Sequence, residues 1–308
     1  MKKSLVFMAT AAMLLATVSC TKEGVYNPKE KIADIHQSVL YTTTSSYAGT
    51  NVTETDTTPK HMTEKWEWDG KLLSSISYYS YNRTTKESEF SYKLSMTYDG
   101  KKLTKVAESN ETYTVYSYDG SLINKMEEFY KGKLVRTYDI THDGKKIVKI
   151  VVTHIEEVDL TKSAEYALGM LLPSSRAMDI LRRSSKDGAS NTQTIDLTND
   201  GGNVTKMVMT FGNETYTAEF TFDKKKNPFY GCYANMGDGG ISFLNENNVL
   251  TEKTTWAQNG SADESETTTY TYEYDGKYPV SVSYSNTSSQ GEYYTSTRTY
   301  TTYYEYAE

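Results

Sequence analysis

The chain has 308 residues, with 40 Asp and Glu against 33 Lys and Arg, which gives a net charge of −7 at pH 7. This acidic balance argues against nucleic acids and anionic lipid head groups as partners, because both bind basic surfaces. The length suits one large domain, or two at most, and the chain is rich in Tyr, with 28 residues.

Residues 1–19 are typical of a secretory signal peptide. Lys2 and Lys3 precede an apolar run from Leu5 to Val18, which is too short for a comfortable transmembrane helix. No second apolar run follows, so the sequence predicts no other membrane-spanning segment. Removal of the signal with its two Lys would take the net charge from −7 to −9.

Cys20 follows the apolar run directly, and the segment 17–20 resembles a bacterial lipobox. Thr17 departs from that pattern, in which Leu is usual at this position. We predict that Cys20 is lipidated and becomes the first mature residue, since more than one acyl chain gives stable anchoring. The alternative is ordinary signal cleavage near Ser19, which leaves Cys20 as an idle thiol. With Cys20 lipidated, Cys232 has no partner for an intramolecular disulfide.

Residues 20–61 are predicted to contain the lipidated Cys, a tether and a first strand. The strand is expected near residues 38–41. The segment 41–61 is rich in Thr and Ser, which favours either a hairpin arm or a loose tether.

From Trp66 onward, a degenerate pattern recurs around Asp-Gly pairs. An apolar or aromatic residue stands three positions before the Asp, and others stand four and seven positions after it. Six copies have their Asp-Gly pairs at 69–70, 99–100, 119–120, 143–144, 200–201 and 275–276. Two partial copies cover 220–229 and 244–250. We interpret residues 62–308 as a domain of repeated β-hairpins.

Asp-Gly favours a tight turn, because Gly accepts positive φ and Asp can hydrogen-bond the backbone that follows it. Residues before the turn alternate, as Tyr270, Tyr272 and Tyr274 do, which predicts a half-buried strand. The two apolar residues after the turn are an odd number of positions apart, which breaks the strand period. We therefore expect a bulge or loop residue before the second strand proper.

Three segments carry a resemblance to known sequences, namely 21–32, 63–69 and 272–280. With the Tyr-Asp-Gly copies, they resemble a group of uncharacterised outer-membrane lipoproteins of gut-commensal Gram-negative bacteria. The repeat is similar to the wider class of YD-repeat proteins, whose repeats build long winding β-sheets. The resemblance implies an outer-membrane lipoprotein on the cell surface or the periplasmic face, and Glu23 resembles a surface-export signal. It implies no catalytic residue.

Residues 161–185 interrupt the repeats. The segment 163–172 favours a helix, Pro173 ends it, and 174–183 could begin a second short helix. We interpret this as a helical insertion that covers an open end of the sheet. The alternative is a lid over a cavity for an apolar ligand.

No metal-ligand spacing stands out. The four histidines are scattered, at His36, His61, His142 and His154. The segment 196–201 begins like a calcium loop, but Met207 stands where a bidentate Glu is needed. We therefore predict no metal and no cofactor.

Catalytic patterns are equally weak. Glu127 and Glu128 are neighbours, as are Glu156 and Glu157, so in strands they face opposite ways and make poor acid–base pairs. Distant carboxylates could still pair in the fold. Cys232 has no nearby His and is expected to be a buried, inert thiol. We predict a non-enzymatic protein.

The Tyr residues fit two roles. Tyr is a favoured strand residue whose ring stabilises sheets, and exposed rows of Tyr can also stack on sugars or peptides. In the last strand, alternation places Tyr300, Tyr304 and Tyr306 on one face and Tyr303 on the other. We expect Tyr300 and Tyr304 to be buried and Tyr303 to be more exposed.

The sequence thus predicts an all-β fold, an antiparallel meander of hairpins that forms a long twisted sheet rolling toward a barrel or spiral. The expected function is a lipid-anchored envelope protein that binds or scaffolds. Alternatives are capture of a glycan or protein ligand by Tyr-rich strands, carriage of an apolar ligand under the insertion and, through carboxylates that the fold brings together, hydrolysis.

Cys20→Ala should abolish membrane anchoring, because the acyl chains would lose their attachment point. Detergent partitioning of cell fractions measures this, and the variant should appear as a soluble or unprocessed form. Retention with the membranes at the wild-type level would show that Cys20 is not the anchor.

Overall fold

The computed structural model describes residues 26–47, 50–155, 192–233, 240–258, 261–290 and 294–307. Within these ranges the secondary structure is β, apart from a short 3-10 helix, η1 (Gly240–Leu244). This part of the chain contains no helix long and apolar enough to cross a membrane. Cys20 and the predicted helical insertion at 161–185 lie outside the described residues.

Seventeen strands form one sheet. In chain order they are β1 (Ile32–Tyr47), β2 (Thr50–Asp69), β3 (Leu72–Asn82), β4 (Glu87–Asp99), β5 (Lys102–Ala107), β6 (Tyr113–Asp119), β7 (Leu122–Tyr130), β8 (Lys133–Asp143), β9 (Lys146–His154), β10 (Thr192–Asp200), β11 (Asn203–Phe211), β12 (Glu214–Phe222), β13 (Val249–Gln258), β14 (Ser261–Thr269), β15 (Thr271–Asp275), β16 (Tyr278–Gln290) and β17 (Tyr294–Tyr306).

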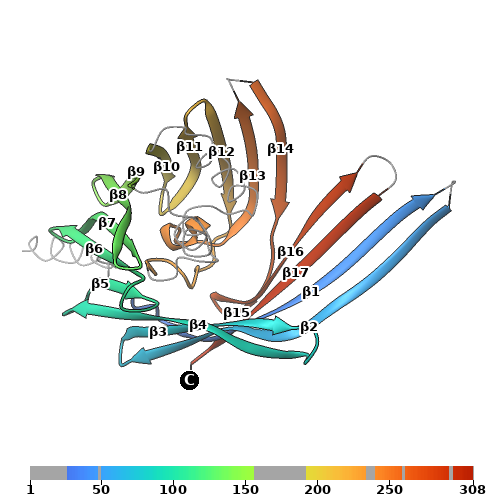
Figure 1. Cartoon of the computed structure of the whole chain (residues 1–308), viewed down its shortest axis with the longest axis horizontal. Coiled ribbons are helices and arrows are strands. Elements are labelled where there is room, and N and C mark those ends of the chain that lie inside the picture. Colours follow the sequence, from blue (N-terminus) through green and yellow to red (C-terminus); the bar gives the residue numbers. More distant parts are fainter. Residues whose placement is uncertain are drawn as a thin grey trace, which may run out of the picture.

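The sheet curls into a nearly closed, barrel-like shape (Figure 1). Every described ladder is antiparallel, and β1 pairs with both β2 and β17, which joins the two ends of the meander. The predicted all-β meander is therefore confirmed.

One seam stays open in this ring. β14 pairs with β13, and β15 pairs with β16, while Tyr270 separates β14 from β15. No ladder between β14 and β16 is found in the described residues, and Figure 1 shows the two strands diverging above β15. We call this gap the seam.

The six Asp-Gly turns share one geometry. Asp99 pairs with Lys102, so Gly100 and Lys101 form a two-residue turn, and Gly100 has a φ of 60°. The register then shifts, because Tyr98 pairs with Leu103 but Thr97 pairs with Lys105. The residue five positions after the Asp is therefore bulged out. The same shift occurs in the other five copies and confirms the predicted bulge.

The bulge restores the inward orientation of both apolar residues after the turn. Leu103 and Val106 are buried, although three positions separate them, and Met96 lies opposite Val106. In three copies the bulged residue also donates its hydroxyl to a strand carbonyl: Ser74 to Glu67 at 2.9 Å, Thr104 to Thr97 at 3.1 Å and Thr205 to Thr198 at 3.3 Å. The hydroxyl of the extra residue therefore satisfies this strand carbonyl with a hydrogen bond.

In three repeats, the side chain just before the Asp connects the repeat to the previous one. The acceptor is the carbonyl of the residue four positions after the previous Asp. The bonds run from Tyr98 to Leu73 (2.7 Å), from Tyr118 to Leu103 (2.7 Å) and from Asn199 to Ile147 (2.9 Å). Around the closure, Tyr306 donates to Pro279 (2.7 Å) and Trp68 to Ile32 (2.8 Å). Tyr98, Tyr118 and Tyr306 therefore have a structural role.

β12 and β13 form a seventh hairpin with the same bulge, but its turn is replaced by residues 223–248. Phe222 pairs with Val249, and after a register shift Phe220 pairs with Glu252. The two partial copies predicted at 220–229 and 244–250 are therefore wrong as separate repeats, since they belong to the two sides of one hairpin. We call the described residues of this connection, 223–233 and 240–248, the plug.

The plug lies inside the ring of strands (Figure 1). Its Cys232, Ile241 and Phe243 belong to the same apolar core as the inward residues of the repeats. Tyr116 donates to the carbonyl of Tyr233 at 3.0 Å. Cys232 is fully buried, as expected. The plug thus fills the end of the sheet where the Asp-Gly turns lie.

At the other end, β16, β17, β1 and β2 project as an arm, made of residues 284–290, 294–300, 39–47 and 50–58 (Figure 1). The Thr/Ser-rich segment is therefore a hairpin arm, and the predicted domain boundary at residue 62 falls within β2. Hydroxyl pairs cross its strands, such as Thr287 with Thr297 at 3.0 Å and Thr44 with Thr53 at 3.2 Å.

The last strand alternates as predicted. Tyr304 lies opposite Ile35 and packs against the core, and Tyr300 lies opposite Val39. Tyr303 is on the outer face, 3.3 Å from the Ser38 hydroxyl. Tyr300, Tyr303 and Tyr304 are all half-buried, so the predicted greater exposure of Tyr303 is not found.

Gly100→Val should lower the free energy of unfolding by about 1–3 kcal/mol, because a β-branched residue is strained at positive φ. A Cβ at Gly100 would meet no atom within 4 Å, so any loss reflects the backbone alone. Urea melts measure it, with Gly100→Asn as the control, since Asn tolerates this φ better. Equal stability of both variants and the wild type would contradict the turn geometry.

Candidate functional site

Three groups of polar or aromatic side chains stand out from the repeat pattern. One lies on the outer face of β1 and β17, one is buried between β7 and β9, and one lines the inner face at the seam. They differ in burial and in how completely their polar atoms are bonded.

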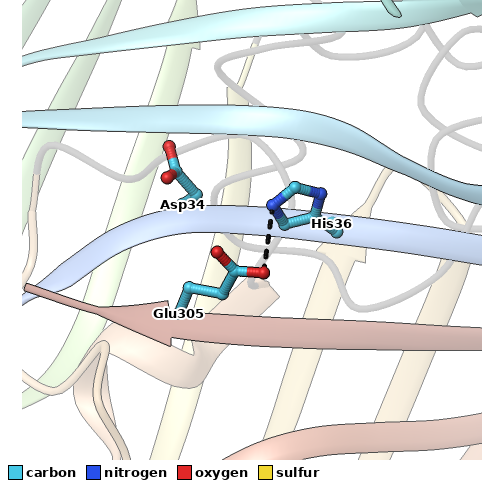
Figure 2. A group of neighbouring side chains, drawn as sticks. All are labelled: Asp34, His36 and Glu305. Atoms are coloured by element: carbon cyan, nitrogen blue, oxygen red, sulfur yellow. Dashed lines mark ion pairs between the residues drawn. The ribbon is translucent and has the colours of Figure 1, made fainter. Parts of the chain in front are cut away.

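The outer group contains Asp34, His36 and Glu305 (Figure 2). Asp34 lies opposite Glu305, and His36 is two residues further along β1, on the same face. The His36 Nε2 atom lies 3.4 Å from the Glu305 Oε1 atom, and one potential ligand atom from each residue lies within 4.8 Å of the others. These residue types could hold a divalent cation.

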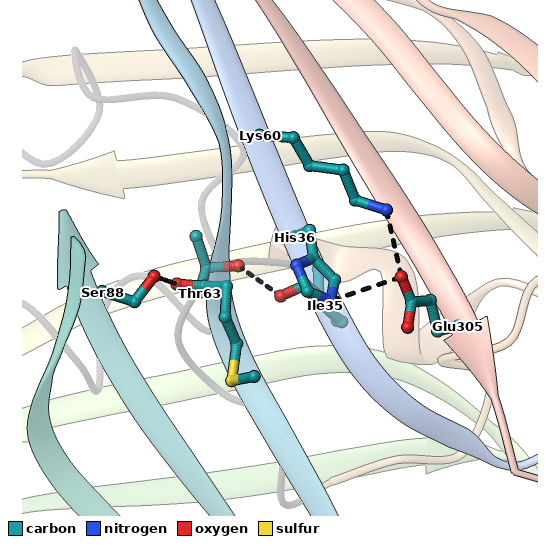
Figure 3. Close-up of polar contacts among 7 residues, drawn as sticks. Ile35, His36, Lys60, Thr63, Ser88 and Glu305 are labelled. Carbon is teal, nitrogen blue, oxygen red and sulfur yellow. Dashed lines mark hydrogen bonds and ion pairs between the residues drawn. The ribbon is translucent and has the colours of Figure 1, made fainter. Parts of the chain in front are cut away.

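Lys60 already forms an ion pair with Glu305 in this group. The Lys60 Nζ atom lies 3.0 Å from Glu305 Oε1, and Thr63 and Ser88 extend the polar contacts across β2 (Figure 3). The hydrogen bond from Lys60, with the nearby His36, lowers the pKa of the Glu305 carboxyl. An ammonium on this oxygen competes with a metal ion, so we interpret the group as an ion-pair contact between β17, β1 and β2.

The buried group contains Glu128, Arg136 and Tyr138. The Arg136 Nη1 atom lies 3.1 Å from Glu128 Oε2 and 3.1 Å from Tyr138 Oη, and the Tyr138 hydroxyl lies 3.2 Å from the same carboxylate oxygen. Burial raises the pKa of Glu128, although Arg136 acts against the rise. Glu127, its neighbour, instead contacts Lys125, so the two Glu face opposite ways as predicted.

His154 lies opposite Arg136 in the ladder of β8 and β9. Burial, with repulsion from Arg136, lowers the pKa of His154 to about 4. The ring is therefore neutral at pH 7 and adds no second positive charge. The buried group is thus one ion pair with polar support, which suits a structural role.

The third group begins with a row of aromatic rings on the inner face at the seam. The ring centroids of Tyr270 and Tyr284 are 5.3 Å apart, and those of Tyr284 and Tyr300 are 5.1 Å apart with an interplanar angle of 16°. All three residues are half-buried. We call them the aromatic row.

Glu252 lies beside this row. The Tyr270 hydroxyl donates to Glu252 Oε2 at 3.0 Å, while the buried Oε1 atom has no partner. Burial, with repulsion from Glu266, raises the pKa of Glu252 to about 7, against the hydrogen bond from Tyr270. Four residues along β13, the Trp256 indole nitrogen is also buried and without a partner. An acceptor and a donor are therefore both left unsatisfied here.

Sequence reasoning found parts of these groups. It placed Tyr300 and Tyr304 on one face and separated Glu127 from Glu128. It missed Glu252, Trp256 and the cluster of Asp34 with Glu305, since no local spacing connects them. A signal for Glu252 did exist, because it lies in the seventh hairpin at a position where the Asp-Gly hairpins carry an apolar residue.

Glu128→Ala should lower the free energy of unfolding by about 3–5 kcal/mol, because Arg136 would keep a buried charge without its counter-ion. Thermal or urea melts measure this. The double variant Glu128→Leu/Arg136→Met should be much closer to the wild type. If the double variant is as unstable as Glu128→Ala, the cost does not come from an unpaired charge.

A solved structure of a porin-like protein from Bacteroides uniformis resembles this fold, with a TM-score of 0.50 and 12% sequence identity. The likeness covers 88% of this chain and 97% of that chain. No protein-family model matches the sequence, and no curated protein matches it significantly. At this identity, the likeness shows a shared all-β, barrel-like fold in a protein of a gut bacterium.

Proposed function

We propose that the protein is a lipid-anchored component of the cell envelope that captures a glycan on the inner face of its open sheet, without catalysing a reaction. The observation that carries this proposal is the aromatic row of Tyr270, Tyr284 and Tyr300, which is half-buried beside the seam. Inner-face residues around the Asp-Gly turns are instead buried in the apolar core or packed against it.

The row suits a flat ligand with apolar faces and polar edges. Tyr presents an apolar face and a hydroxyl, and sugar rings stack on such faces. The stacking of Tyr284 on Tyr300 holds both rings in place, so little side-chain freedom is lost on binding.

The predicted anchor at Cys20 would set the orientation of the protein in the envelope. Cys20 is six residues before Tyr26, so a lipid on Cys20 would lie within about 20 Å of Tyr26 by chain length alone. Tyr26 belongs to the core and hydrogen-bonds Pro228 in the plug. The plug end would therefore face the membrane and the arm would point away from it. The similar protein from Bacteroides uniformis is porin-like, which fits an envelope role.

Carboxylates support a binding role over hydrolysis. The three buried Glu of the described ranges each contact a different partner: Glu64 accepts from Trp66 at 2.7 Å, Glu128 pairs with Arg136, and Glu252 accepts from Tyr270. A glycosidase needs two carboxyl groups that face one another across the scissile bond. Nucleic acid is not a proposed partner, because the chain is acidic.

A glycan array with the detergent-solubilised full chain tests this function. We expect binding to at least one glycan class and a loss of about tenfold or more in Tyr284→Ala and in Tyr300→Ala, since stacking on each ring contributes. Tyr303→Ala is the matched control, because Tyr303 is on the outer face of the same strand.

Two results would contradict the proposal. One is a stable protein that binds no glycan on the array. The other is an equal loss in all three variants, which would indicate general damage to β16 and β17. A scaffold role would then replace capture.

A further inference from the structure

The repeat itself marks Glu252 as an exception. In the six Asp-Gly hairpins, the residue seven positions after the Asp points inward, is apolar and is buried: Ile76, Val106, Met126, Ile150, Met207 and Val282. In the seventh hairpin, the register of Phe220 puts Glu252 at this position. A carboxyl group thus stands where six other hairpins have a core residue.

A carboxyl group at this core position lowers the stability of the fold. Glu252 is only 3% exposed, and one of its two carboxyl oxygens has no partner. Burying a carboxyl group without full hydrogen bonding destabilises a protein, whereas an apolar residue of similar size would add to the core. A buried polar group of this kind calls for an explanation other than packing, such as an absent bonding partner.

Trp256 supplies a second unsatisfied atom on the same wall. Glu252 and Trp256 lie opposite Phe220 and Tyr216 of β12, so both point inward, and four strand residues separate them by about 13 Å. The indole ring is half-buried, while its N–H has no acceptor. An acceptor at Glu252 and a donor at Trp256 therefore stand on one wall, with the aromatic row beside them.

We propose that Glu252 and Trp256 are the hydrogen-bonding residues of a saccharide subsite that continues the aromatic row of Tyr270, Tyr284 and Tyr300. The proposal rests on the glycan capture proposed above and names the polar anchors of that site. Sugar hydroxyls both donate and accept, so they satisfy the carboxyl oxygen and the indole N–H together. The spacing requires at least two sugar rings. An ammonium ligand would leave the indole N–H unpaired.

The surroundings of Glu252 give the site a pH dependence. Phe220 and Thr268 lie opposite it on β12 and β14, and the titratable groups that face it are Tyr270 and Glu266. Because burial raises the pKa of Glu252 to about 7, the carboxylate is present above that pH and lost below it. A carboxylate accepts hydroxyl hydrogen bonds better than a carboxylic acid does, so affinity should fall as the pH drops through 7.

The test measures binding of cello-, malto-, xylo- and manno-hexaose to the detergent-solubilised full chain by calorimetry. The pH is varied from about 5.5 to about 8.5, which spans roughly one to two units on either side of 7. For a hexaose that binds, Glu252→Gln should weaken affinity by about tenfold and flatten its pH profile. Trp256→Phe keeps a ring but removes the N–H, and should weaken affinity similarly.

Glu252→Met separates binding from structure, because Met is the residue that two other hairpins carry at this position. We expect the melting temperature to stay equal or rise while hexaose binding is lost. A lower melting temperature with unchanged binding would overturn the proposal and make Glu252 a structural partner of Tyr270.

The two proposals fail in different ways. If no hexaose binds the wild type and the glycan array is also blank, the capture function fails and the subsite fails with it. If a hexaose binds and Tyr284→Ala weakens it, but Glu252→Gln and Trp256→Phe do not, only the subsite is wrong. Tighter binding of spermidine than of any hexaose would also overturn it, in favour of a cationic ligand.

Discussion

The bulge five positions after each Asp determines the rest of the structure. A strand alternates with period two, so apolar residues four and seven after the Asp would otherwise face opposite sides. One extra residue, such as Thr104, brings Leu103 and Val106 to the same face. Because the six Asp-Gly hairpins and the hairpin of β12 and β13 repeat this shift, they offer an apolar face on the same side. The sheet can bury that face only by curling around it.

Hydrogen bonds from side chains hold the curled sheet in register. Tyr98 and Tyr118 each reach the carbonyl of the preceding hairpin, and Tyr306 closes the ring with a bond to Pro279. Asn199 makes the same kind of contact with Ile147, but Tyr is the commoner donor in this set, since its side chain is rigid and ends in a hydroxyl. The high Tyr content therefore follows from the architecture for one set of positions. This structural role does not account for the aromatic row at the seam, where the Tyr rings contact each other.

The sequence predicts what depends on neighbours along the chain and misses what depends on strands that meet from far away. Asp-Gly turns, the alternation and the bulge are local, and all were predicted. The plug was not predicted, because its sequence resembles weak copies of the repeat. Its position is set by contacts with β6 and β11, which are distant in the sequence. The pairing of β1 with β17, which brings Asp34 to Glu305, is likewise set by closure of the ring and not by spacing.

The open seam and the candidate binding surface are one feature. If β14 paired with β16 along its length, Tyr270 and Tyr284 would be enclosed with the core. Instead the strands part at Tyr270, and the rings on both sides of the gap remain half-buried. The hairpin that precedes the seam is also the one that breaks the repeat, with a plug for a turn and Glu252 for a core residue. Departures from a repeat that is otherwise kept cost stability, and proteins concentrate such departures at functional sites. Their clustering beside one gap is why we locate function there.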